Sequence, residues 1–315
     1  MNKWTINEQS LSNKKYQILA VADLCLDILV TGPVQPQFNQ VELLADNYSL
    51  DLGGSVGIFA SQFSKLGGNI ALIGKTGNDA AGEFILKRLQ HAGVDTGLIA
   101  ICENKRTSMG LNLYCKNDRA MLTYLGVMEL ITPALFTDEL VSAAHHWHIG
   151  GYFLLEKLIP GWPAWLRRLK LNGVTISLDS NWDPSGQWNN IAELLPMVDV
   201  FLPNEAEAMA LAGKTDIMES GRLLADLCPL VVIKNGEKGA FVFQDNHAIH
   251  YPVPAELVKD LSIVDTTGAG DNFDAGFMYA WLSNKEISVC MEKGFRCAVS
   301  SLMALGGIEN QIVKT

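Results

Sequence analysis

The sequence predicts an α/β fold, in which a mostly parallel β-sheet is covered by helices on both faces and a small second β-sheet lies over it. Apolar runs typical of buried strands alternate with helical patterns along most of the chain, as in proteins built from strand–helix–strand units. Two stretches, 29–50 and 105–125, break this rhythm because polar and apolar residues alternate in them, as in exposed strands. With 315 residues, of which 48% are hydrophobic, the chain can bury a large core.

The individual elements follow from apolar spacing and from the residues that bound it. Apolar residues recur at helical spacing over 56–66, and Gly67 and Gly68 then end the helix, as glycine commonly does. A second helix is expected to run from residue 84 to Gly93. Buried strands are expected over 16–22, 70–73, 174–178, 198–202 and 230–233. Residues 1–15 are polar, and we expect a loose arm there.

This pattern predicts one structural unit with an inserted lid. The α/β core takes residues 1–28, 51–104 and 126–315, and the lid is formed by 29–50 and 105–125. A sheet of two to four strands cannot hide both of its faces. We therefore expect one face to close over a ligand and the lid of a second copy to cover the remaining surface, giving a homodimer.

Composition excludes several classes of partner. The formal net charge is -10, whereas nucleic acids and anionic membranes favour a basic surface, so we expect neither as a partner. No apolar run approaches the roughly 18 residues of a membrane-spanning helix, and the N-terminus lacks the apolar stretch of a secretory signal. The six cysteines are scattered with no CxxC pair, which predicts a reduced, cytoplasmic protein.

The most informative segment is 263–277. A strand is expected to end at Asp265, a loop of small residues containing Gly268, Ala269 and Gly270 follows, and a helix is expected to start near Asp271. Such a loop leaves backbone N–H groups uncovered at a helix N-terminus, where the helix dipole also favours negative charge. It is suited to a terminal phosphate and to the charge that develops during its transfer.

Asp271 admits two interpretations. In the first turn of the helix it could orient an acceptor hydroxyl beside the phosphate and take its proton late in the reaction, as phosphoryl transfer requires. It could equally act as a cap of the helix. The residues alone favour neither.

A resemblance favours the catalytic interpretation. The run Asp265, Thr266, Thr267, Gly268, Ala269, Gly270 and Asp271, followed by Phe273, Gly276 and Phe277, resembles the C-terminal motif of the PfkB/ribokinase-like family of carbohydrate kinases. Gly53, Gly54, Ala60, Leu66, Gly67, Gly74, Gly77, Asp79, Gly82, Gly93 and Val94 resemble its N-terminal motif. The resemblance covers residues 16–310. It implies a three-layer α/β core with a β-sheet lid, ATP as the phosphoryl donor, Mg²⁺ as its partner and Asp271 as the catalytic base.

The same resemblance assigns the acceptor site. Asp27 matches the carboxylate that accepts hydrogen bonds from acceptor hydroxyls, and without the family it would be an ordinary capping or loop residue. Gly53 and Gly54 belong to the same site. Asn181 lies in a segment similar to one found in keto-deoxy-gluconate and fructose kinases.

The nucleotide site is assigned in the same way. Asn204 and Glu207 match the family's Asn-x-x-Glu, which organises Mg²⁺ through water, although the pair also has the spacing of a helix capping box. Lys234, Gly236 and Gly239 match the segment that lines ATP, and both glycines could equally be turn residues. In relatives a monovalent cation such as K⁺ binds behind the phosphate loop, at the positions of Asp265 and Thr267.

Departures from the family pattern bear on the acceptor. Ile58 stands where an acceptor-binding Asn is usual, Ser55 where ribokinases and phosphofructokinases carry Lys, and Asp183 where some relatives carry Arg. An acid at position 183 would repel a carboxylate or phosphate. We therefore expect a neutral sugar or polyol as acceptor. A nucleoside kinase, or a non-catalytic ligand-binding regulator on the same fold, remains the alternative.

Overall fold

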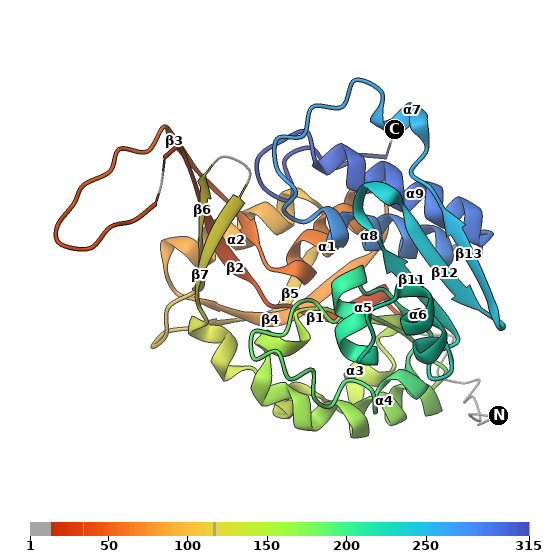
Figure 1. The fold of residues 1–315 in the computed structure, drawn as a ribbon. Helices are drawn as coiled ribbons and strands as arrows, with labels where there is room; N and C mark the ends of the chain where they lie inside the picture. The colour runs from red at the N-terminus through yellow and green to blue at the C-terminus, as the bar shows by residue number, and fades with distance from the viewer. Residues whose placement is uncertain (1–13, 34, 116–117, 315) are drawn as a thin grey trace.

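The structure, a computed structural model, describes residues 14–33, 35–115 and 118–314. Nearly all of the expected N-terminal arm therefore lies outside the described residues. Within those residues the chain forms a nine-stranded sheet, here called the main sheet, and a four-stranded sheet, here called the small sheet (Figure 1). Both sheets were expected from the sequence.

The main sheet has the strand order β13-β12-β11-β10-β9-β8-β1-β4-β5. Its strands are β1 (Tyr16–Val21), β4 (Ile70–Gly77), β5 (Asp95–Cys102), β8 (Ala144–Ile149), β9 (Thr175–Leu178), β10 (Val200–Phe201), β11 (Leu230–Lys234), β12 (Ala240–Gln244) and β13 (His247–Tyr251). Pairing is parallel from β5 to β11, and the hairpin β12–β13 adds an antiparallel edge. The sequence did not predict this hairpin.

Helices cover both faces of the main sheet (Figure 1). One layer holds α1 (Ser55–Lys65), α2 (Ala80–His91), α8 (Ala269–Trp281) and α9 (Ile287–Ser301), and the other holds α3 (Asp138–Val141), α4 (Trp162–Leu171), α5 (Glu205–Ala212) and α6 (Ile217–Ala225). The short helix α7 (Ala255–Val258) lies in the connection to α8. Ile18 and Ala20 of β1 pack into the first layer, whereas Leu19 and Val21 pack into the second. Burial on both faces explains why the parallel strands are continuous apolar runs.

The segment before α8 differs from the prediction. Residues 263–265 form no strand, because Ile263 and Val264 are 60% and 56% exposed and the Val264 N–H donates to the Leu302 carbonyl at 2.8 Å instead of to a neighbouring strand. Helix α8 also begins earlier than expected, at Ala269. Its N-cap is Gly268, whose φ of 72° is left-handed and favours glycine.

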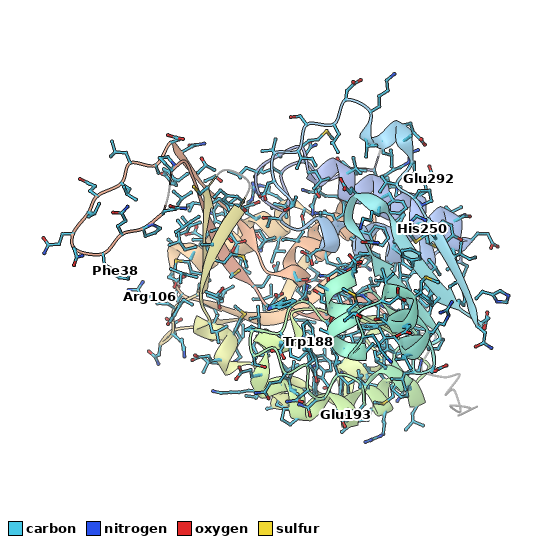
Figure 2. All side chains as sticks on the ribbon, in the orientation of Figure 1. Phe38, Arg106, Trp188, Glu193, His250 and Glu292 are labelled. Carbon is cyan, nitrogen blue, oxygen red and sulfur yellow. The ribbon has the colours of Figure 1, made fainter. Side chains whose placement is uncertain are left out.

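The small sheet contains β2 (Cys25–Thr31), β3 (Asn47–Gly53), β6 (Ser108–Cys115) and β7 (Asp118–Tyr124), in the order β3-β2-β6-β7. The strands β2–β3 and β6–β7 pair antiparallel, and the two distant segments meet through the parallel pair β2–β6. The first segment is also not strand throughout. Residues 35–46 form a loop that projects from the body, with Phe38 94% exposed near its tip (Figure 2).

No helix in the described part of the chain combines the length and hydropathy needed to span a lipid bilayer.

Helices α8 and α9 pack closely at Gly276. A Cβ atom there would lie 2.6 Å from the Lys293 carbonyl oxygen and 2.8 Å from the Cys297 sulfur, closer than atoms can approach. We expect Gly276→Val to lower the free energy of unfolding by about 1–3 kcal/mol, as overpacked cores do, measured by urea denaturation. Lys285→Ala, at an exposed position beyond α8, is the control. Equal stability of the two variants would contradict this packing.

Candidate active site

The candidate site lies at one edge of the main sheet. Strands β1, β8, β9, β10 and β11 are mutually parallel or linked by parallel neighbours, so their carboxyl ends meet there. Asp23 follows β1, Asp179 and Asn181 follow β9, Asn204 follows β10, and Lys234 is the last residue of β11. The carboxyl edge of an open parallel sheet is where such folds bind ligands.

Gly53 and Gly54 occupy positions where a side chain would collide with Asp27 and Asp23. The side chain of Asp23 accepts hydrogen bonds from the N–H groups of Ser55 and Val56, both at 3.0 Å, and so holds the start of α1. Gly54 has a φ of 90°, and a Cβ there would lie 2.2 Å from the Asp23 carbonyl oxygen. A Cβ on Gly53 would lie 2.3 Å from Asp27 Oδ1. Gly53 therefore makes room for the Asp27 side chain, and Gly54 for the Asp23 backbone.

Asp27 lies on the small sheet between two glycines. It pairs with Gly110 of the neighbouring strand, where a Cβ would lie 2.4 Å from Asp27 Oδ1. The thiol of Cys25 donates a hydrogen bond to the same oxygen at 3.3 Å. The structure thus brings Asp27, predicted for the acceptor site, next to the glycine pair that precedes Ser55.

Asp271 is joined to the acceptor side of the site by a hydrogen-bonded chain. Its Oδ1 accepts a hydrogen bond from Ser55 Oγ, which accepts one from Asn181 Nδ2 at 3.0 Å. Asn181 Oδ1 in turn accepts the Gly151 N–H at 2.6 Å. Asp271 does not serve as the N-cap of α8, because Gly268 holds that position. Its carboxylate points across the site instead of along its own helix.

The electrostatic surroundings shift Asp271 into the neutral range. Burial and the negative charge of Asp179 raise the pKa of Asp271 to about 7, while the Ser55 hydrogen bond and the Lys234 charge act in the opposite direction. A carboxylate with this pKa is suited to accept a proton near neutral pH.

Lys234 contacts carboxylates. Its Nζ donates to Asp179 Oδ2 at 2.9 Å and to Asp274 Oδ2 at 2.8 Å. Burial lowers the pKa of Lys234, but the charges of these two partners outweigh it and raise that pKa above its ordinary value. The predicted role of Lys234 in binding ATP is therefore not evident from its contacts.

Asn204 and Glu207 form the capping box that their spacing allowed. The Asn204 side chain accepts the Glu207 N–H, and Glu207 Oε2 accepts the Asn204 N–H, both at 2.9 Å. Burial and the Asp179 charge raise the pKa of Glu207 to about 7. The cap uses one carboxylate oxygen, so the other suits a water ligand of Mg²⁺. The described residues contain no cluster of three metal-ligating side chains.

A hydrogen-bond network surrounds Asp265 and Thr267, the positions at which the resemblance implied a monovalent cation. Asp265 Oδ1 accepts the N–H and hydroxyl of Thr267 at 3.0 and 2.9 Å. Its Oδ2 accepts the Gly306 N–H at 2.9 Å and lies 3.0 Å from the Tyr114 hydroxyl. Four groups thus surround a carboxylate that has about four acceptor sites. Binding of a monovalent cation at Asp265 and Thr267 remains a prediction.

The glycines of the loop 268–270 and of the turn 236–239 have different structural reasons. Gly268 packs against Gly307 and Ile58, where a Cβ would lie 3.0–3.1 Å from their carbon atoms. A Cβ on Gly270 would meet only Lys234 at 3.5 Å or more. Gly236 and Gly239 both have left-handed φ angles, 53° and 98°, and form the turn between β11 and β12. Their part in binding ATP remains a prediction.

Two of the departures from the family pattern have structural explanations. Ile58 is buried and packs against Gly268 of the loop 268–270, so an apolar residue at this position is explained by packing. Asp183 is also buried, and its oxygens accept the N–H groups of Ser185 at 2.8 Å and Trp188 at 2.7 Å. Asp183 stabilises its own turn, and the expectation that its charge repels an anionic acceptor has no support in these contacts.

Sequence reasoning did not assign a role to Asp23, Asp179 or Asp274. Asp23 and Asp179 directly follow predicted buried strands, and that position was the available signal. Asp274 follows Asp271 by three residues on the same helix, and only the fold shows that it meets Lys234.

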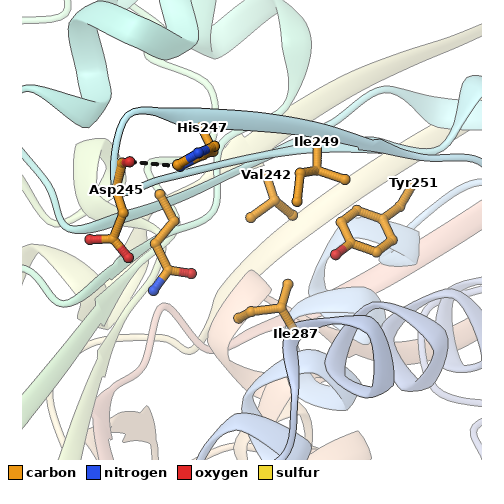
Figure 3. A pocket seen from close by; sticks show the side chains of 7 residues that line it. Val242, Asp245, His247, Ile249, Tyr251 and Ile287 are labelled. Carbon is orange, nitrogen blue, oxygen red and sulfur yellow. Dashed lines mark hydrogen bonds between the residues drawn. The ribbon is translucent and has the colours of Figure 1, made fainter.

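A cavity elsewhere contains none of the predicted site residues. It measures about 240 Å³ and is lined by Val242, Gln244, Asp245, His247, Ile249, Tyr251 and Ile287, between the β12–β13 hairpin and the start of α9 (Figure 3). The chemistry-bearing groups lie instead at the carboxyl edge of the sheet.

Comparisons with known proteins identify relatives of this chain. An ATP-dependent 6-phosphofructokinase from Thermoanaerobacterium thermosaccharolyticum is 25% identical, and the match covers 94% of this chain and 91% of the relative. A cytidine kinase from Thermococcus kodakarensis is also 25% identical, over 81% of this chain and 88% of its own length. The structure of Arabidopsis thaliana ribokinase complexed with ribose and ATP superposes with a TM-score of 0.81 at 23% identity, covering 94% of this chain and 95% of that one.

The model of the pfkB family carbohydrate kinases matches residues 19–312, which include the whole candidate site. The chain therefore belongs to the pfkB family of carbohydrate kinases.

Proposed function

We propose that this protein transfers the γ-phosphoryl group of ATP to a hydroxyl of a small neutral sugar or polyol. The observation that carries the proposal is the position of Asp271, in the first turn of α8 directly after 268–270 and hydrogen-bonded through Ser55 toward the acceptor side. Family membership supports it, as does the position of Asp27 beside Gly53, two residues before the Ser55 that contacts Asp271.

In the proposed reaction Asp27 accepts hydrogen bonds from the acceptor and orients its hydroxyls. The reacting hydroxyl donates to Asp271, which takes its proton as the bond to phosphorus forms. Ser55 and Asn181 hold the Asp271 carboxylate before the acceptor arrives. The base thus needs no reorganisation when the substrate binds.

The loop 268–270 receives the transferred phosphate. The loop stands at the positive end of α8, a helix of 13 residues, which favours an anion there. Gly236, Gly239 and Asn204 would line the rest of ATP. Mg²⁺, held near Glu207 through water, would neutralise phosphate charge. A monovalent cation such as K⁺ would bind behind the loop, near Asp265 and Thr267.

A neutral acceptor follows from the charges around it. Asp27 and Asp271 are both acidic, and the neighbouring ammonium of Lys234 is already bound by Asp179 and Asp274. Ser55, at a position where phosphofructokinases of the family carry Lys, brings no positive charge. A nucleoside is the second candidate, favoured by the similarity to a cytidine kinase.

We further propose that 29–50 and 105–125, which carry most of the small sheet, form a lid hinged on the core. Its Tyr114 hydroxyl lies 2.7 Å from Thr267 Oγ1, so the sheet reaches the phosphate loop. Closure over the site would exclude water that otherwise hydrolyses ATP.

The outer face of this lid is the proposed dimer interface. Leu50, Ile28, Leu111 and Leu122 are in register across β3, β2, β6 and β7, so an apolar row crosses the sheet. Asp27 lies on the opposite face because neighbouring strand residues alternate. Leu122 is 65% exposed, and β3 and β7 are the edge strands of the small sheet, so a second lid would cover the apolar row and these edges.

We place the enzyme in the cytoplasm, where its six free cysteines would stay reduced.

Replacing the proposed base should abolish turnover. We expect Asp271→Asn to lower kcat on the order of 10²–10⁴-fold with ATP binding retained. In the wild-type enzyme kcat should rise as pH increases through about 7, because the base must be ionised and its pKa is raised to about 7. Steady-state kinetics across pH test both statements. Asp226→Asn, at an exposed position after α6, should keep normal kcat. Normal kcat in Asp271→Asn would refute the assignment.

The acceptor class can be tested by ADP release across a panel. Neutral sugars, polyols and nucleosides should be phosphorylated, whereas sugar phosphates and sugar acids should not, because the acceptor would face carboxylates. The highest kcat/KM for a sugar phosphate would overturn this expectation.

Sedimentation velocity at micromolar concentration tests the interface. The wild-type protein should sediment as a dimer and Leu122→Lys as a monomer, since a charge would interrupt the apolar row. Leu223→Lys changes a leucine that is exposed on α6 and should stay dimeric. A monomeric wild-type protein would rule out the interface.

A further inference from the structure

Lys234 occupies an unusual place for a cation. It ends β11 and its side chain is only 13% exposed, while the side chains of its partners Asp179 and Asp274 are 4% and 1% exposed. The ion cluster therefore ties β9, β11 and α8 together below the surface. Removing one partner of such a buried pair is strongly unfavourable.

The ammonium of Lys234 also lies against the start of α8. A Cβ on Gly270 would be 3.5 Å from Lys234 Nζ. The N-terminus of a helix carries partial positive charge, so a cation beside it is unfavourable unless anions compensate. Asp179 and Asp274 provide that compensation. The ammonium of Lys234 lies beside Gly270, the residue before Asp271.

The cluster holds more acids than bases. Asp271 is influenced by Asp179 and Asp23 from the ends of β9 and β1 and by Lys234 from β11. Glu207 on α5 is likewise influenced by Asp179 and Lys234. Burial raises the pKa of Asp274 well above its ordinary value, while the charge of Lys234 acts in the opposite direction. Burial also acts to raise the pKa of Asp179, but Lys234 and hydrogen bonds outweigh it, and that pKa is lowered.

We propose that Lys234 is a positioning residue for phosphoryl transfer, which acts on Asp271 as the positive charge beneath the first turn of α8 and is not a ligand of ATP. The role rests on the proposed function, in which Asp271 is the base. Lys234 favours the ionised, proton-accepting form of Asp271, and Asp179 opposes it. Together the two set the pH range in which the base works.

Lys234→Met tests this role because it keeps the aliphatic stem and removes the charge. The acid limb of the kcat–pH profile should move to higher pH by about one unit, which is about a tenfold loss of kcat on that limb, with recovery at alkaline pH. ATP affinity measured by calorimetry should change less than threefold, on the order expected for a residue without a nucleotide contact. Loss of ATP affinity by more than about tenfold would make Lys234 a nucleotide ligand and overturn the proposal.

Asp179→Asn gives a second test of opposite sign. It removes the negative charge next to Lys234, so the acid limb should move to lower pH. If Lys234→Met does not fold, this variant decides, and an unmoved limb overturns the proposal.

Lys170→Met is the matched control. The Lys170 side chain is also 13% exposed, and its Nζ pairs with Asp199 at 2.6 Å near the amino end of β10, away from the site. It should lose stability without any shift of the profile. An equal shift in this control would show a general effect and refute the role of Lys234. Activity retained by Asp271→Asn would instead refute the proposed function, so the two failures are distinguishable.

Discussion

The parallel order of the strands from β5 to β11 is the constraint on which the site depends. Because these strands run in one direction, their carboxyl ends share an edge, and the residues that follow them converge there although they are far apart in the chain. Asp23, Asp179, Asn204 and Lys234 meet in this way. Helix α8 then places Asp271 above the same edge from a distant part of the sequence.

Convergence of so many carboxylates has an electrostatic consequence. Buried negative charges raise one another's pKa, and Asp271 and Glu207 both reach about 7. The ammonium of Lys234 acts in the opposite direction and lowers the pKa of both carboxyl groups. The site is therefore poised near neutrality by the balance of one buried cation against several acids.

Close backbone approach is the second requirement of the site. Gly54 meets the Asp23 carbonyl, Gly53 meets Asp27, and Gly268 meets Gly307 and Ile58. Each contact joins two elements at a distance that a side chain would prevent. The glycines of the family motifs thus act as spacers that let the small sheet, α1 and α8 meet at one point.

The sequence by itself determined the fold class, most strands and the loop at 268–270, because apolar periodicity and glycine placement are local signals. It also contained the capping box of Asn204 and Glu207, which depends only on spacing. It could not determine where side chains point across elements. Asp183 was interpreted as facing the acceptor but binds its own turn, and residues 263–265 look like a strand but find no neighbouring strand to pair with.

Only the tertiary structure decided the partners of Lys234, the contact of Ser55 with Asp271 and the arrangement around Asp265. Apart from the contacts of Asp265 with Thr267, each joins residues separated by at least 40 positions in the chain. Such contacts arise from strand order and helix packing, which no local pattern records. The sequence therefore specified which chemical groups are present, and the fold specified which of them act on one another.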